Sequence, residues 1–149
     1  MAGLVEALTQ YQANSVVYAS TAHGFHWNVE GPMFTEFHEF FDEVYTDLDG
    51  TLDTISEFLR KLGVKAPYTL EDFIASNNVG DTKIDSTSPI AMTRVLYQIN
   101  EKFIADIKNM FDIATQNREQ GIANYLADRQ DQHEKWSWFM RSIMTSTVN

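Results

Sequence analysis

Apolar residues recur at helical spacing along nearly the whole chain, and this pattern predicts four long helices. The expected ranges are about 4–28, about 33–62, 88 to about 116, and from a polar turn near 117–121 to about 144. Gly31 and Pro32 separate the first two ranges, because proline and glycine break helical geometry and allow a turn. Seven glycines and three prolines in 149 residues agree with a chain built mainly of long helices.

The second range has the clearest apolar stripe. Five of its apolar residues recur at intervals of seven, and four more lie between them: Phe34, Phe41, Leu48, Ile55 and Leu62, joined by Phe37, Val44, Leu52 and Leu59. A stripe of this kind is typical of a helix face that packs on a core. Gly63 follows at the position where a helix commonly ends.

The connection from 64 to 88 is too long for a simple loop between neighbouring helices. Within it, TLEDFIAS predicts a short helix capped by Thr69, with Asp72 three residues later. Ser88 followed by Pro89 predicts the start of the next long helix. The pattern favours an all-α, ferritin-like four-helix bundle with a short extra helix in the crossover, although other four-helix topologies fit it too. No linker or repeat divides residues 1–149, so we expect a single domain.

A band of imidazole and carboxylate side chains adjoins the apolar stripe of the second helix. On a helical wheel with His38 at zero, the acidic residues lie between about 20° and about 100°. They are Asp42, Asp49, Asp53 and Glu57. An ordinary solvated face with an incidental histidine fits these positions, and so does a metal site, because imidazole and carboxylate suit iron, manganese and zinc.

Within one chain, the two ends of this band are too far apart to bind the same ion. His38 and Asp53 are fifteen residues apart on one helix, which is about 22 Å. A bundle-interior di-iron site uses Glu-x-x-His, which the chain lacks. Two copies of the helix, crossing antiparallel about a two-fold axis near Tyr45 and Thr46, would form two equal sites. At each site His38 of one copy meets Asp53 of the other, and His26 folds back over the turn.

These residues resemble the signature of the Dps proteins, or mini-ferritins. The matching segments of the site are His26-Trp27, HEFFD from His38 to Asp42, and DTISE from Asp53 to Glu57. Further matching segments are NVEGP from Asn28, TLEDF from Thr69 and HEKWSWFMRS from His133. The resemblance therefore covers nearly the whole chain.

The resemblance implies a homo-dodecameric shell that oxidises Fe(II), generally with hydrogen peroxide in preference to oxygen, and stores the Fe(III) mineral in its cavity. Such a ferroxidase protects the cell against oxidative damage. The implied metal ligands are His26, His38, Asp42, Asp53 and Glu57. Asp42 is the expected ligand of a second iron or of a bound water, and Trp27 either absorbs stray oxidising equivalents or simply packs.

A second group of residues is implied at the iron-entry pores. Asn124, Asp128 and Asp131 share one helical face, and relatives often have an acid at the position of Asn124. This arrangement fits a pore with one acidic ring lost, and it fits an ordinary solvated face equally well. His23 and His133 do not match the ligand spacing, so we expect them to be structural.

Charge and composition narrow the alternatives. The formal charge of −10 opposes binding to phosphate backbones, and the final TSTVN has no Lys or Arg, so direct DNA binding is not expected. A DNA-compacting protein, or a shell that stores manganese or zinc, remains the alternative. The chain has no cysteine and no apolar run long enough for a membrane span, which favours a cytoplasmic protein.

Overall fold

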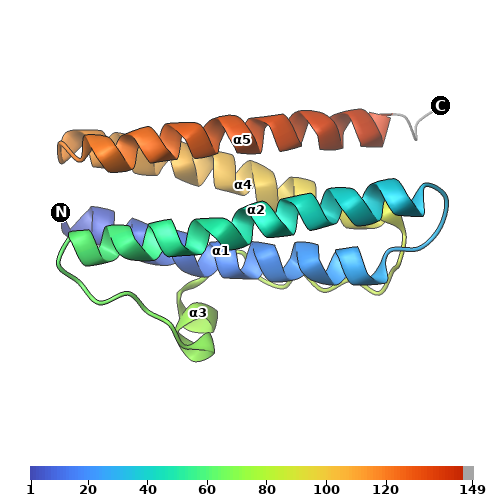
Figure 1. Ribbon diagram of the computed structural model, residues 1–149, viewed down its shortest axis with the longest axis horizontal. Coiled ribbons are helices and arrows are strands. Elements are labelled where there is room, and N and C mark those ends of the chain that lie inside the picture. Colours follow the sequence, from blue (N-terminus) through green and yellow to red (C-terminus); the bar gives the residue numbers. More distant parts are fainter. Residues whose placement is uncertain (146–149) are drawn as a thin grey trace.

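The structure is a computed structural model that describes residues 1–145. The helices are α1 (Ala2–Asn28), α2 (Phe34–Lys61), α3 (Leu70–Ser76), α4 (Pro89–Gln116) and α5 (Gln120–Thr145). The hairpins α1–α2 and α4–α5 pack on each other as two layers of a four-helix bundle (Figure 1). The long crossover from α2 to α4 carries α3, so the predicted fold class is confirmed.

Helix boundaries lie within two residues of the predicted ones. α1 begins at Ala2, two residues earlier than expected, and α2 begins at Phe34 after Met33, whose φ is 62°. Both predicted caps are present: Thr69 accepts a hydrogen bond from the backbone N–H of Asp72, and Ser88 caps α4. The final TSTVN falls outside the described residues except for Thr145, which is the last residue of α5. Within residues 1–145, no helix is long and apolar enough to cross a bilayer.

Two helices end in a left-handed residue that satisfies the last carbonyl groups. Gly63 has φ 89° and donates to the carbonyl of Arg60 at the end of α2. Arg118 has φ 60° and donates to the carbonyl of Thr115 at the end of α4. In both cases the next residue donates to a carbonyl five positions earlier, which completes a Schellman motif. Glycine adopts this conformation without strain, whereas arginine does so at a cost.

The predicted stripe of α2 forms much of the core, with one correction. Its buried members are Phe37, Phe41, Val44, Leu48, Ile55 and Leu59. Leu52 and Leu62 are only partly buried. Phe34 was predicted to be in the core, but its side chain is 43% exposed. It occupies the first turn of α2, where its ring lies against His38 instead of the bundle interior.

A polar network crosses the centre of the bundle. Asn100 is fully buried on α4, and its side-chain oxygen accepts hydrogen bonds from the Tyr18 hydroxyl and from His133 Nδ1. Its side-chain nitrogen donates to the His133 carbonyl and to the Ser137 hydroxyl. Asn100 therefore has a partner for both of its polar atoms and ties α4 to α1 and α5.

The network continues from His133 to an ion pair. Arg129 donates to His133 Nε2 at 3.1 Å and to Asp47 Oδ1 of α2 at 2.6 Å. Because Nε2 accepts a hydrogen bond, the proton of His133 resides on Nδ1 and the ring is neutral. Burial, together with the neighbouring Arg129 guanidinium, holds the pKa of His133 well below its usual value. The prediction that His133 is structural agrees with its full burial among these partners.

Candidate metal half-site

Two histidines meet where the α1–α2 hairpin turns. His26 lies in the last turn of α1 and His38 in the second turn of α2, and their rings stack with centroids 3.8 Å apart. Each ring is bonded to the backbone of the other residue: His26 Nδ1 lies 2.6 Å from the His38 carbonyl oxygen, and His38 Nδ1 lies 2.7 Å from that of His26. The two side chains therefore fix each other across the hairpin.

These hydrogen bonds determine which nitrogen of each ring can bind a metal. A carbonyl oxygen only accepts, so both Nδ1 atoms must carry a proton and donate it. A neutral imidazole with a proton on Nδ1 keeps a lone pair on Nε2. Hydrogen bonding of the second ring nitrogen is also what orients metal-binding histidines in proteins. His26 and His38 thus each keep Nε2, with its lone pair, in a fixed orientation as a metal-binding atom.

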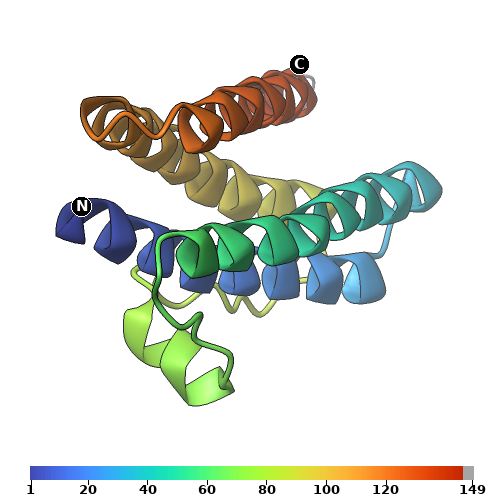
Figure 2. The same ribbon diagram turned by 60° about the vertical axis from the view of Figure 1, so that its left-hand side comes forward.

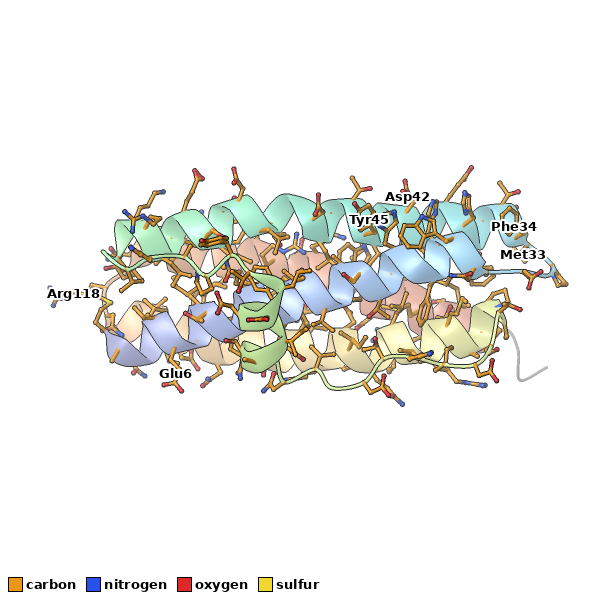
Figure 3. All side chains as sticks on the ribbon, turned by 90° about the horizontal axis from the view of Figure 1, so that it is seen from below. Glu6, Met33, Phe34, Asp42, Tyr45 and Arg118 are labelled. Atoms are coloured by element: carbon orange, nitrogen blue, oxygen red, sulfur yellow. The ribbon has the colours of Figure 1, made fainter. Side chains whose placement is uncertain are left out.

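Asp42 adds a carboxylate to this pair. Its Oδ1 lies 3.9 Å from His26 Nε2, which is too far for a hydrogen bond. Two donor atoms that each lie about 2.1 Å from one metal ion are at most about 4.2 Å apart, so the separation is compatible with a shared ion. Asp42 is exposed and lies next to Tyr45, in the half of α2 that begins at Phe34 (Figure 3). The three side chains form the histidine half-site: His26, His38 and Asp42.

Asp53 and Glu57 lie elsewhere on α2. Both are exposed in the half of the helix that leads to Gly63, and they form the acidic half-site. Within residues 1–145, no three His, Asp or Glu side chains form a group that could bind one ion, so the three residues of the histidine half-site do not complete a metal site by themselves. A single chain therefore presents its five candidate ligands as two separate groups. Their union across two chains remains a prediction.

Aromatic rings surround the histidine half-site. His23 stacks on Tyr45 with centroids 3.7 Å apart and planes 9° apart, and it also lies 4.1 Å from the Trp27 ring. Trp27 is 65% exposed and reaches the half-site through His23. His23 was expected to be structural, and this packing role fits that expectation. The sequence pattern did not lead us to place His23 beside the site. The available signal was its position three residues before His26, which is on the same helical face.

The predicted pore residues lie on the first half of α5. Asn124, Asp128 and Asp131 are all exposed. Exposure is required both for a pore lining and for an ordinary solvated face, so the assignment stays a prediction.

Comparisons with known proteins agree with the fold. The family described as "Ferritin-like domain" matches residues 5–147. Among curated relatives, DNA protection during starvation protein 2 of Bacillus anthracis is 25% identical, over 95% of this chain and 96% of its own length. An uncharacterized low temperature-induced protein of Nostoc is 28% identical, over 95% of this chain and 80% of its own.

Solved structures show the same fold. A Dps protein from Bacillus brevis superposes with a TM-score of 0.89 at 26% identity, covering 95% of this chain and 94% of its own. Dps from Vibrio cholerae, described as a member of a broad superfamily of ferritin-like diiron-carboxylate proteins, gives a TM-score of 0.90 at 22% identity, covering 95% and 89%. Together with the family match, these relatives show that the chain belongs to the Dps family of the ferritin-like superfamily.

Proposed function

We propose that the protein is an iron-storing mini-ferritin, a ferroxidase that oxidises Fe(II) at sites shared between two chains. The observation that carries this proposal is the reciprocal pair of hydrogen bonds between His26 and His38. It leaves a lone pair on the Nε2 atom of each ring, with Asp42 Oδ1 3.9 Å from that of His26, on a helix that also presents Asp53 and Glu57 to solvent. Imidazole and carboxylate together suit Fe(II), which is here the substrate.

Each ligand type has its own task in this proposal. Asp53 and Glu57 bring negative charge that stabilises the Fe(III) product, and in this proposal the Glu57 carboxylate can bridge two irons. The neutral imidazoles of His26 and His38 limit the affinity for Fe(III), so that the product can leave for the cavity. Trp27 is exposed and in contact with His23, a position suited to absorbing stray oxidising equivalents.

The proposed reaction takes hydrogen peroxide as the preferred oxidant. Two Fe(II) ions give one electron each to one molecule of peroxide, and with two water molecules they form two units of Fe(III) oxyhydroxide and release four protons. The mineral is stored in a dodecameric shell, which iron enters past Asn124, Asp128 and Asp131. Removal of both Fe(II) and peroxide protects against oxidative damage.

The divided site gives a direct test by complementation. His38→Ala and Asp53→Ala shells should each oxidise Fe(II) at least about tenfold more slowly than wild type, because every site loses a ligand. When the two chains are co-assembled in equal amounts, half of the interfaces are mixed, and each mixed interface keeps one intact site of two. Stopped-flow measurement of Fe(II) oxidation by peroxide should therefore recover about a quarter of the wild-type activity.

A matched control comes from the same helix. Glu43 is exposed on α2 but lies about 100° around the helix from Asp42, so Glu43→Ala shells should oxidise Fe(II) at the wild-type rate. If hybrid shells form but recover no activity, the ligands do not come from two chains. If wild-type shells bind zinc or manganese but do not oxidise Fe(II), the alternative of a metal-storing shell replaces the ferroxidase.

A further inference from the structure

A groove of about 660 Å³ lies between the second half of α1 and the crossover that leads to α4. The buried side chains of Phe25 and Met92 contribute apolar surface to it, and Gly24 of α1 and residues 81–87 of the crossover line its sides. None of the five candidate metal ligands lines the groove. Its volume is within the range of ligand sites in proteins, so the groove is a separate candidate for binding.

The crossover is nearly extended beside this groove. After α3 it runs along α1 before it enters α4 (Figure 2). Asn14 and Asn78 exchange two hydrogen bonds of 2.8 Å, and further along both segments the hydroxyls of Thr21 and Thr82 lie 2.7 Å apart. Four crossover residues therefore cover the length of seven helical residues, about 10 Å, which is about 2.6 Å per residue. A helix advances about 1.5 Å per residue and a fully extended chain about 3.3 Å, so the crossover is closer to the extended form.

The part of the crossover that lines the groove leaves several backbone groups unpaired. At its far end Glu30 donates its N–H to the Thr87 carbonyl at 2.9 Å. Within residues 1–145, the N–H and carbonyl groups of Ile84, Asp85 and Ser86 have no hydrogen-bond partner. An extended segment with free donors and acceptors can pair with the main chain of a second extended segment, as one strand pairs with another.

The charges along the groove select a partner of defined chemistry. Asp81 and Asp85 are exposed, and within residues 1–145 neither carboxylate forms an ion pair. Four residues of nearly extended chain place them about 10–13 Å apart, which is the distance between residues four apart on an extended peptide. Lys83 lies between the two carboxylates, so the middle of a bound peptide is best uncharged. The chain charge of −10 adds a long-range attraction for a basic partner.

We propose that the groove binds an extended peptide segment of another protein, with one apolar residue and a Lys or Arg two positions away on each side of it. The apolar side chain packs against Phe25 and Met92, and the two basic side chains pair with Asp81 and Asp85. The peptide main chain pairs with the free backbone groups of the crossover. This binding does not involve the metal ligands, so it is independent of the proposed iron chemistry.

A defined peptide tests the proposal. Fluorescein-labelled Lys-Thr-Leu-Thr-Lys, blocked at both ends, should bind the wild-type protein in a fluorescence anisotropy titration. The peptide Lys-Thr-Ser-Thr-Lys should bind at least about tenfold more weakly, because it has no apolar side chain to bury in the groove. The peptide Glu-Thr-Leu-Thr-Glu should not bind, because its carboxylates face those of the groove.

A leucine at Gly24 should block the groove without disturbing the fold. No atom lies within 4 Å of a Cβ built on Gly24, and leucine suits a helix better than glycine does. Gly24→Leu should weaken binding of Lys-Thr-Leu-Thr-Lys at least about tenfold. Gly3→Leu is the matched control, because Gly3 also lies on α1 with open space at its Cβ, and it should bind like wild type. Equal binding to wild type and Gly24→Leu, or no binding to wild type, would overturn the groove site.

Two further measurements separate the parts of the contact. Asp85→Lys should weaken binding at least about threefold, whereas Asp112→Lys, exposed on α4, changes the net charge equally and should have no effect. Equal losses in the two variants would mean that the peptide binds the acidic surface without a site. In hydrogen exchange followed by mass spectrometry, saturating peptide should slow exchange in residues 82–87 but not in the turn at 117–119. Unchanged exchange in residues 82–87 would overturn the main-chain pairing.

Discussion

At the scale of single residues, the hydrogen bonds of a histidine decide its role in this chain. His26 and His38 each donate from Nδ1 to a carbonyl and keep Nε2 available. His133 donates from Nδ1 to Asn100 and accepts on Nε2 from Arg129, so both of its nitrogens are occupied. The same side chain thus serves as a candidate ligand at the hairpin turn and as a structural link in the core.

Asn100 should be the most costly polar residue to remove from the core. Asn100→Leu leaves the hydroxyl of Tyr18, Nδ1 of His133 and the hydroxyl of Ser137 buried with their hydrogen bonds lost. We expect the free energy of unfolding to fall by about 3 kcal/mol, measured by urea denaturation at a fixed protein concentration. Asn109→Leu, an exposed site on α4, should change it by less than about 0.5 kcal/mol. A cost below about 1 kcal/mol for Asn100→Leu would contradict the network.

His133 should make stability depend on pH. Burial and Arg129 lower its pKa in the folded chain, while in the unfolded chain the pKa is about 6.5. The unfolded state therefore takes up a proton first as pH falls, so the contribution of His133 is fully present above about pH 6.5 and is lost progressively below it.

The slope of stability against pH tests this assignment. Between pH 6.5 and pH 5, wild type should lose up to about 1.4 kcal/mol per pH unit through this single residue. His133→Gln should be less stable at pH 7.5 but should show a smaller slope, because the titrating group is gone. Equal slopes in the two proteins would show that His133 does not titrate in this way.

At the scale of elements, the two Schellman motifs share their hydrogen-bond pattern but have different residues in the left-handed conformation, Gly63 and Arg118. Arg118→Gly should raise the free energy of unfolding by about 1 kcal/mol, because glycine adopts a positive φ without the steric cost of a Cβ. Gly63→Ala should lower it by a similar amount. No atom lies within 4 Å of a Cβ built on Gly63, so its effect reports the backbone alone.

Thermal unfolding at one protein concentration compares the two variants. Arg118 lies at the end of the molecule opposite to Met33 and Phe34 (Figure 3), so the substitution leaves the half-site intact and the iron oxidation rate unchanged. A lower midpoint temperature for Arg118→Gly would mean that the arginine side chain stabilises the fold by a contact that outweighs its backbone strain.

Sequence patterns predicted the elements because the signals are local. The stripe of α2, the caps at Thr69 and Ser88 and the glycine after α2 depend on residues within a few positions of one another. Phe34 was misplaced because periodicity assigns a face but does not show where the neighbouring helices end. The stack of His23 on Tyr45 depends on how α1 packs against α2, which no local pattern contains.

The candidate site was only partly predictable for the same reason. Spacing alone separated His38 from Asp53, and the structure brings His26 next to His38 and to Asp42. The reciprocal hydrogen bonds use Nδ1 of each ring and so leave Nε2 as the metal-binding atom. They could not be predicted without the geometry of the hairpin. The proposed contribution of a second chain lies beyond what the folding of one chain determines.

At the scale of the whole molecule, net charge should decide the relation to DNA. Twelve chains of −10 give about −120 for the proposed shell, and repulsion from phosphate is strongest at low salt. We expect no mobility shift of duplex DNA in EDTA at neutral pH. Protection of DNA from iron and peroxide should disappear in an Asp53→Ala, Glu57→Ala shell. Retarded DNA in EDTA, or protection by that variant, would favour the DNA-compacting alternative.

The separation of the two half-sites along α2 has a consequence for the order in which assembly and iron oxidation can occur. A single subunit carries both groups of candidate ligands but holds them apart, and within residues 1–145 no three of them form a group that could bind an ion. On the proposed function, iron oxidation starts only when a second subunit arrives, and the container then forms together with the reactive centre. Ferric product would thus not be released from orphan subunits into the surroundings, where it would precipitate unconfined.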